Sequence, residues 1–181
     1  MALKSTIYKA VLQVSDIDRN VYGDYALTLA CHPSETPERL MVRLLAYALN
    51  ADEHLAFGKG LSSADEPDLA LSDLTGVMLQ WIEVGQPDER TLLKACGRAA
   101  SVRVYAYSAS VDLWWKPLAD KLARAKNLSV YKIAAEQSQG LARLAARNMA
   151  LQCIVQDGQV WVSNEIDSVQ LELTALMSPG Q

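Results

Sequence analysis

Residues 77–84, VMLQWIEV, constrain the fold most, because only Gln80 and Glu83 interrupt an otherwise apolar run. A run of this length and composition is typical of a strand that other elements cover on both faces. Two further apolar segments of strand length follow, over residues 102–107 and 128–133, with helical patterns between them. The middle of the chain therefore predicts a mixed sheet built from alternating strands and helices.

The helices around this sheet are marked by their starts and apolar stripes. Thr36 and Pro37 are suited to the N-cap and first turn of a helix that is expected to run to about Asp52. A second helix opens at Asp88, a third stretch begins near Ser110, where Pro117 is expected to split it, and a fourth covers residues 136–147. The second helix is expected to turn four residues inward, namely Leu92, Leu93, Cys96 and Ala99.

Both ends of the chain predict antiparallel strands. Alternating apolar residues occur over 6–14 and 23–30, and the Asp157-Gly158 pair is a strong turn signal between two strands. A last alternating segment covers 169–175, before an end at 178–181 that is expected to fray. The fold class predicted is α+β, in a single domain over residues 1–181: a mixed sheet flanked by helices, with terminal hairpins that join into a small sheet of their own.

Composition restricts the setting and the function. The 181 residues carry a net charge of -4, half of them are apolar, and no apolar run is long enough for a membrane span. The start of the sequence lacks an export signal. The cysteines Cys31, Cys96 and Cys153 are odd in number and widely spaced, which does not suit a set of disulfides, so the protein is expected in a reducing cytoplasm. Phosphate-loop, zinc-protease and serine-hydrolase motifs are missing. The net acidity argues against a global nucleic-acid footprint but leaves room for a local basic face.

The remaining candidates for chemistry are carboxylates. Glu83 lies in the apolar strand, where a charge is costly unless it is paired, hydrogen-bonded or bound to a cation. Asp68 and Asp73 lie upstream, and carboxylates converging from neighbouring strands suit Mg²⁺, which prefers oxygen ligands. We therefore expect a metal site of Glu83 with Asp68 or Asp73. Singly, the two aspartates are also typical of solvated turns.

Each of these residues also has a purely structural interpretation. Glu83 would equally serve as a helix cap or an ion-pair partner of an arginine: Arg39, Arg43 or Arg90. Arg90, Lys94 and Arg98 share one helix face, which is typical of either a solvated surface or a phosphate-contacting stripe. Glu38 and Arg39, in a predicted first helical turn, are candidates for positioning a substrate, although an acid there is also favoured by the helix dipole.

Several segments together resemble the bacterial YaeQ family across essentially the whole chain. They are Ala2-Leu3-Lys4, Thr6-Ile7-Tyr8-Lys9, His32-Pro33-Ser34-Glu35-Thr36, Asp65-Glu66-Pro67, Trp81-Ile82-Glu83-Val84-Gly85, Pro87-Asp88-Glu89-Arg90, Asn127-Leu128-Ser129-Val130 and Gln156-Asp157-Gly158. The resemblance implies a restriction-endonuclease-like fold of the PD-(D/E)xK superfamily with added β structure.

That superfamily pattern implies an acid on one strand and an acid-x-lysine on the next. Asp68, with Asp73 as a competitor, would fill the first position and Glu83 the second, while Gly85 occupies the lysine position. In some members the lysine lies on the following helix, where Lys94 is the candidate here. The resemblance thus implies a Mg²⁺-dependent nuclease-like phosphodiesterase; the alternative is a non-catalytic module that binds nucleic acid or a protein partner, in a transcription-related role.

Overall fold

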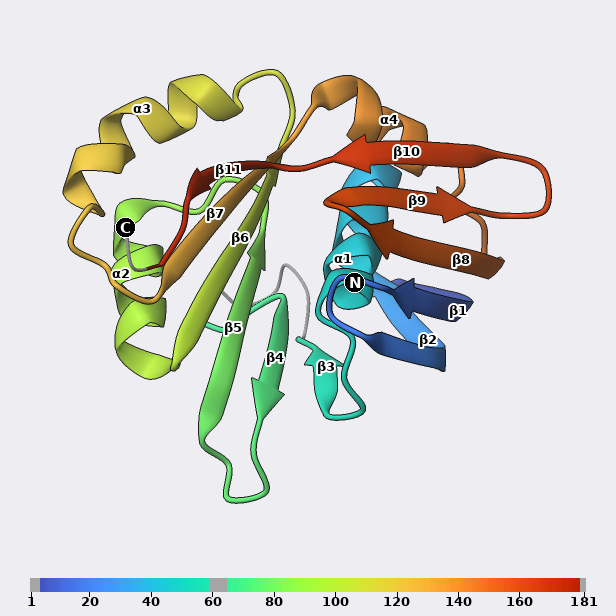
Figure 1. Cartoon of the computed structure of the whole chain (residues 1–181), viewed down its shortest axis with the longest axis horizontal. Helices are drawn as coiled ribbons and strands as arrows, with labels where there is room; N and C mark the ends of the chain where they lie inside the picture. Colours follow the sequence, from blue (N-terminus) through green and yellow to red (C-terminus); the bar gives the residue numbers. More distant parts are fainter. Residues whose placement is uncertain (1–3, 59–64, 180–181) are drawn as a thin grey trace. The chain divides into compact units, whose positions relative to one another are not determined.

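The computed structural model describes residues 4–58 and 65–179 (Figure 1). Predictions that fall on residues 1–3, 59–64 and 180–181, including part of the end expected to fray at 178–181, lie outside the described residues. The helices and strands follow one another along the chain in this order: β1 Thr6–Asp16, β2 Val21–Cys31, α1 Pro37–Leu49, β3 Leu55–Phe57, β4 Leu69–Ser72, β5 Met78–Val84, α2 Glu89–Arg98, β6 Ser101–Tyr107, α3 Val111–Lys121, β7 Leu128–Ile133, α4 Ala135–Ala142, β8 Asn148–Gln156, β9 Gln159–Ser163, β10 Ser168–Glu172 and β11 Thr174–Met177.

The elements form two compact units. One unit comprises the chain up to Ala51 together with Glu136–Leu173, and the other comprises Asp52–Ala135 together with the end of the chain from Thr174. Each unit contains one sheet. The mixed α+β class predicted from the sequence is confirmed, and the predicted single domain over residues 1–181 stays a prediction.

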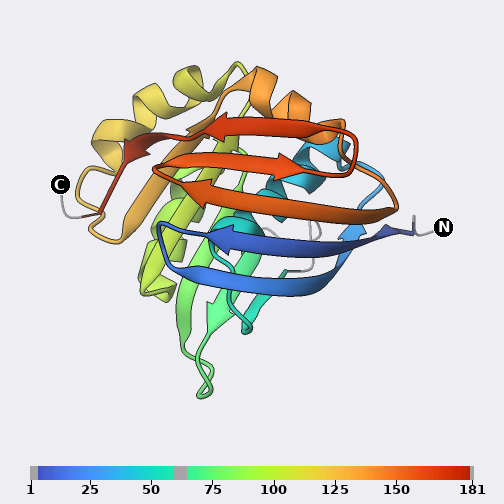
Figure 2. The same cartoon turned by 45° about the vertical axis from the view of Figure 1, so that its right-hand side comes forward.

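The first unit contains a five-stranded sheet in the order β10-β9-β8-β1-β2 (Figure 2). Its N-terminal hairpin pairs β1 with β2, and its C-terminal hairpin turns at Asp157-Gly158 between β8 and β9. Parallel pairing of β1 with β8 joins the two hairpins. The prediction that the terminal hairpins form a sheet of their own is therefore confirmed.

Helix α1 of this unit begins as predicted and ends three residues early. The Thr36 side chain accepts a hydrogen bond from the Arg39 amide, and Pro37 occupies the first turn. The helix ends at Leu49 rather than Asp52, because the Asn50 side-chain amide donates to the Ala46 carbonyl at 2.7 Å while its backbone amide donates to Tyr47.

The second unit contains a six-stranded sheet in the order β11-β7-β6-β5-β4-β3, in which β5, β6 and β7 are parallel. Trp81 and Ile82 are consecutive on β5, so their side chains point to opposite faces, yet only 2% and 0% of their surfaces are exposed. This confirms a central strand covered on both faces. Trp81 packs in a cluster with residues of α2 and α3, among them Leu92 and Trp115.

Two helices differ from the predictions. Pro117 lies inside α3 without splitting it, since Trp115 and Leu118 are both buried on the cluster of the second unit and hold the helix across the missing hydrogen bond. Helix α4 ends at Ala142 instead of Arg147. The Arg143, Leu144 and Ala145 amides then bond carbonyls three residues back, which is a tighter turn that leads the chain into β8.

Two further details of the sequence pattern were assigned wrongly. Leu93 was expected to face inward on α2, but 49% of its surface is exposed, because Leu92 and Ala95 form the buried face. The alternating segment 169–175 is not one strand: β10 ends at Glu172 in the first sheet and β11 starts at Thr174 in the second. Alternation continues across this break, so the pattern alone does not reveal it.

Candidate functional site

Asp68 and Glu83 lie on neighbouring strands of the six-stranded sheet. Antiparallel pairing sets Leu69 opposite Ile82, so Asp68, one residue before β4, reaches the end of β5 that carries Glu83. The Asp68 amide donates to the Ile82 carbonyl at 2.9 Å, and the Val84 amide donates to Asp68 Oδ2 at 2.7 Å. The fold thus brings two acids that are 15 positions apart in the sequence to the same end of one hairpin.

Both acids have hydrogen-bond donors that offset their partial burial. Asp68 is only 5% exposed and is stabilised by the Val84 amide. Glu83 is partly buried, and its Oε1 accepts a hydrogen bond from the Trp81 indole Nε1 at 2.8 Å. Trp81 is two residues away on the same strand, so both side chains lie on one face. The indole supplies the polar partner that the sequence analysis required for Glu83.

Asp73 lies at the other end of β4, in the turn before β5. Its Oδ1 accepts hydrogen bonds from the Thr75 hydroxyl, the Thr75 amide and the Val77 amide, at 2.6, 2.8 and 3.0 Å. These donors, the Thr75 hydroxyl first, hold the pKa of the exposed Asp73 carboxyl below its usual value. With a rise of about 3.3 Å per strand residue, β4 separates Asp73 from Asp68 by roughly 16 Å.

Lys94 on α2 pairs with Asp65, which lies three residues before Asp68. The hydrogen bond and the charge of Lys94 lower the pKa of the Asp65 carboxyl, with smaller contributions from Arg98 and Arg90. Arg90 itself is exposed near the start of α2, where Asp88 caps the helix by accepting from the Thr91 amide at 2.8 Å. The basic face of α2 is therefore in part an ion-paired face.

A cluster of polar side chains that the sequence analysis missed lies after β5 and β6. The Gln86 side-chain amide donates to the hydroxyls of Ser108 and Ser110 at 3.1 and 2.8 Å. Ser108 has a backbone φ of 105°, which is rare for a residue with a side chain. Because β5 and β6 are parallel, their carboxyl ends meet at one edge of the sheet. The positions of these residues directly after two predicted strands are the sequence signal that could have found the cluster.

Glu38 and Arg39 lie in the other compact unit, on the first turn of α1. Glu38 Oε1 accepts from the Ser138 hydroxyl at 2.6 Å, and Arg39 lies 3.7 Å from Glu35 Oε1. The same Glu35 oxygen accepts from Arg43 at 2.8 Å. The Glu35–Arg43 pair was not predicted, although Glu35, Arg39 and Arg43 are spaced by four residues each, as on one helix face.

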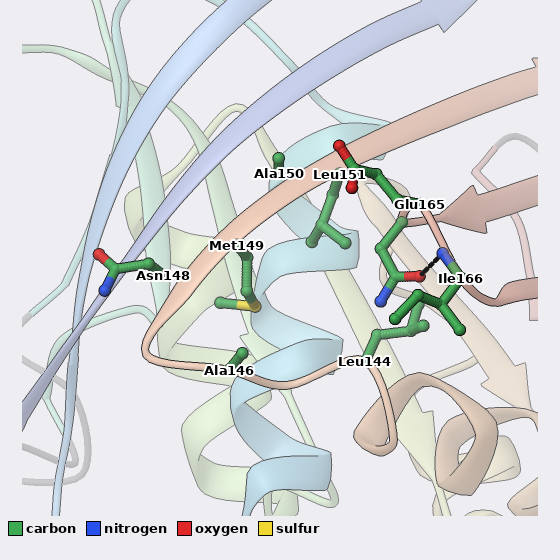
Figure 3. Close-up of a pocket in the computed structure, with 9 residues that line it drawn as sticks. Leu144, Ala146, Asn148, Met149, Ala150, Leu151, Glu165 and Ile166 are labelled. Atoms are coloured by element: carbon green, nitrogen blue, oxygen red, sulfur yellow. Dashed lines mark hydrogen bonds between the residues drawn. The ribbon is translucent and has the colours of Figure 1, made fainter.

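The first unit also contains a shallow cavity of about 280 Å³ between the chain entering β8 and the β9–β10 loop (Figure 3). Its lining is mainly apolar, and the Asn164 side chain closes one wall by accepting a hydrogen bond from the Ile166 amide at 2.8 Å. The residues that line it are Leu144, Ala146, Asn148, Met149, Ala150, Leu151, Asn164, Glu165 and Ile166. None of the predicted site residues is among them.

Two kinds of feature are absent from the described residues. Within residues 4–58 and 65–179, no group of three or more His, Cys, Asp or Glu side chains is arranged to hold a metal ion. No helix in the same part of the chain is long and apolar enough to cross a membrane. The class defined by the fold and the candidate site is an α+β protein with two mixed sheets and two acidic residues, Asp68 and Glu83, at the same end of one hairpin.

Comparison with known proteins gives the family. The model of the YaeQ protein family matches residues 1–173, and the chain belongs to this family. It is 49% identical over 182 residues to the "Uncharacterized protein YaeQ" of Salmonella typhi, and 46% identical to that of Escherichia coli K12, covering 99% of this chain and 100% of each relative. The family resemblance found in the sequence is thereby confirmed.

Solved structures agree with this assignment. The YaeQ protein from Xanthomonas axonopodis pv. citri superimposes with a TM-score of 0.94 at 45% identity, over 97% of this chain and 99% of that one. The YaeQ protein from Pseudomonas syringae gives a TM-score of 0.92 at 36% identity, over 96% and 97% of the two chains. The fold described above is therefore shared with experimentally determined family members.

Proposed function

We propose that this YaeQ-family protein is a divalent-metal-dependent phosphodiesterase acting on nucleic acid. The observation that carries the proposal is the placement of Asp68 and Glu83 at the same end of the β4–β5 hairpin. Paired carboxylates on adjacent strands suit a hard cation such as Mg²⁺, which binds oxygen ligands and keeps several waters. Asp68 is the partner we propose for Glu83, because Asp73 lies in the turn at the other end of β4.

The donor set fits such an ion. A carboxylate can accept several hydrogen bonds or metal contacts on its two oxygens, and the bonds from Val84 and Trp81 orient Asp68 and Glu83. When bound, Mg²⁺ would lower the pKa of a coordinated water and offset charge that develops on a phosphoryl oxygen. Lys94 and Arg90 on α2 are the proposed phosphate contacts. The substrate-positioning role of Glu38 and Arg39, on α1 of the other unit, stays a prediction from the sequence.

The hairpin also supports kinship with the restriction-endonuclease-like, PD-(D/E)xK proteins. Pro67-Asp68 precedes β4, Glu83 is near the end of β5, and a helix and a parallel strand follow. The lysine position is filled by Gly85, whose φ of 108° suits glycine and leads the chain out of the sheet. We propose that Lys94 takes the role of the missing lysine. It pairs with Asp65 in the free protein, and a substrate phosphate would replace Asp65 as its partner.

A second candidate function is a non-catalytic module that binds nucleic acid or a protein, as in transcription. The observation that favours it is that Gly85 replaces the lysine while Lys94, the proposed substitute, is ion-paired. In this case Asp68 and Glu83 would have a structural role only: their hydrogen bonds with Val84 and Trp81 would stabilise the β4–β5 hairpin. A cytoplasmic location, which we propose for either function, is supported by the three free cysteines.

Calorimetric titration of Mn²⁺ and Mg²⁺ into the full chain distinguishes the two functions. We expect Glu83→Gln, which retains an acceptor for the Trp81 indole, to weaken ion binding by roughly tenfold or more through loss of one charged ligand. Asp73→Asn, the matched change in the turn, should bind as the wild type does. Equal, negligible binding by all three proteins would overturn the phosphodiesterase and leave the binding module.

Cleavage of a fluorescent single- or double-stranded oligonucleotide then tests the chemistry. Activity should require the added ion and fall with Glu83→Gln and with Asp68→Asn, purified in parallel by the same steps. If both variants cleave as fast as the wild type, the activity does not depend on Asp68 and Glu83, and the assigned site is wrong.

A further inference from the structure

The four strands at the sheet edges differ greatly in length. Three of them are short: β10 has five residues, β11 four and β3 three. The fourth, β2, has eleven residues and is paired with β1 along its whole length without a bulge. A long, regular edge strand exposes a row of unpaired backbone groups, which proteins usually avoid.

The outward row of β2 can be identified from one contact. In antiparallel pairing, alternate residues direct both backbone groups toward the neighbouring strand or away from it. The Ala30 carbonyl accepts a hydrogen bond from Arg43, so Ala30 belongs to the row that faces away from β1. Tyr22, Asp24, Ala26 and Thr28 share its parity, and no strand other than β1 pairs with β2 among the described residues.

This edge also lacks the features that normally prevent pairing. Its sequence, VYGDYALTLAC, contains no proline and no lysine, and Asp24 is its single charged residue. The four side chains of the outward row are all exposed, with 59% of the Tyr22 surface accessible. The segment from Tyr22 to Thr28 is therefore an open template for another strand.

We propose that β2 pairs with the β2 strand of a second copy of this chain. Antiparallel pairing about a two-fold axis at Tyr25 makes the edge its own complement, as a two-fold dimer requires. In that register Tyr22 lies opposite Thr28, and Asp24 lies opposite Ala26 of the other copy. Each of the four outward residues then donates and accepts one backbone hydrogen bond, and the two Asp24 carboxylates do not oppose each other.

The extent of the open edge and its charge favour this register: an axis at Tyr25 pairs all four outward residues, whereas an axis at Asp24 would set the two Asp24 carboxylates directly opposite each other. With the axis at Tyr25, Asp24 lies directly opposite a small neutral residue, whereas like charges directly opposite each other across a ladder are destabilising. Substitution at Ala26 therefore reports on Asp24 of the second copy. Ala150, exposed on β8 in the middle of the same sheet, offers a matched position that is not on an edge.

The test measures the mass of the full-length protein by analytical ultracentrifugation from low to high micromolar concentration. We expect a concentration-dependent dimer whose dissociation constant rises roughly tenfold in Ala26→Asp, which opposes two carboxylates, and falls in Ala26→Lys. Ala26→Pro, which removes one backbone amide that points away from β1, should raise the dissociation constant by a similar factor. Circular dichroism and the melting temperature monitor folding of each variant.

Three results would overturn the proposal. If the wild-type protein stays monomeric at every concentration, β2 does not pair with a second copy of the chain. A dimer that Ala26→Asp and Ala26→Pro leave intact uses another surface. A dimer that Ala150→Asp weakens as strongly as Ala26→Asp does is held by the sheet face instead of the edge.

Discussion

Arg43 shows at the scale of one residue how this chain buries a charge. Only 1% of its surface is exposed, and its guanidinium donates to Glu35 Oε1 at 2.8 Å and to the Ala30 carbonyl at 2.9 Å. Glu35 is itself buried, so each charge depends on the other. Burying such a pair costs solvation of both ions, and removing one partner leaves the other uncompensated.

Replacing Arg43 by Met should accordingly destabilise the fold by about 3–5 kcal/mol, because the buried Glu35 carboxylate would lose its hydrogen-bonded cation and keep only the longer 3.7 Å contact with Arg39. Urea denaturation at neutral pH measures this loss. The double variant Arg43→Met with Glu35→Leu should recover part of the stability, since it removes both charges. A double variant as unstable as the single one would contradict this account.

Asp88 provides a second residue-scale prediction, through the cap of α2. The Thr91 side chain and amide hold the pKa of the Asp88 carboxyl below its ordinary value. Because the pKa is lower in the folded state, the stabilisation is present above the unfolded pKa of about 3.9 and is lost as pH falls through the folded pKa.

Asp88→Ala should therefore cost about 1 kcal/mol at pH 7, a typical value for a lost N-cap, and less than this near pH 2. Asp88→Asn, which keeps an acceptor for the Thr91 amide, is the control. Thermal melts across this pH range check the effect; a cost for Asp88→Ala that does not shrink in acid would show that the carboxylate charge contributes nothing.

Individual elements show what the sequence could and could not predict. The strand around Trp81, the start of α1 at Thr36 and the turn at Gly158 were predictable, because each depends on local pattern or turn chemistry. The break at Leu173 was not, because alternation is the same on both sides of it and only tertiary pairing separates the two strands. Pro117 was misjudged for a related reason: packing of the helix overrode a local penalty.

The candidate site divides in the same way. Glu83 was singled out because a charge interrupts an apolar strand, and Asp68, with Asp73 as a competitor, because it lies upstream and suits the first acidic position that the family resemblance implies. The indole of Trp81 as the partner of Glu83 was missed, as was the cluster of Gln86, Ser108 and Ser110. These contacts depend on rotamers and on which strand ends meet, and neither follows from spacing along one chain.

Two glycines give a prediction at the scale of the element. Gly97 in α2 has open space around it, so Gly97→Ala should stabilise the protein by about 0.5 kcal/mol through helix propensity. Gly76, in the β4–β5 turn, has a φ of +88°, so Gly76→Ala should destabilise it by about 1–2 kcal/mol although space is also open. Chemical denaturation of both variants measures the opposite signs, and a shared sign would contradict this assignment of the two backbones.

At the scale of the whole molecule, the first unit is assembled from both ends of the chain. Its two hairpins meet through the parallel pairing of β1 with β8, and Cys153 lies in this pairing opposite Val14. No surface of the Cys153 side chain is exposed, and burial raises the pKa of its thiol to about 12. A thiol so protected reacts only when the sheet opens.

Cys153 should therefore report global unfolding. In native protein near neutral pH, an aromatic disulfide reagent should modify the partly buried Cys96 first, and Cys153 at the rate at which the sheet opens. Because Cys31 is also a buried free thiol, the double variant Cys31→Ser with Cys96→Ser isolates the slow phase of Cys153, whose rate should rise with urea as global unfolding does. Rapid labelling of Cys153 without denaturant would show that the five-stranded sheet opens locally.

The same parallel pairing has a consequence for synthesis on the ribosome. The β1–β2 hairpin emerges first, yet its neighbour β8 begins only at Asn148. At a translation rate of about 5–20 residues per second, the inner edge of β1 must wait roughly 6 to 23 seconds after β2 is made before β8 begins. During that interval a nascent chain presents two open strand edges at once, so chaperone engagement at the exit tunnel should be concentrated on the first fifty residues.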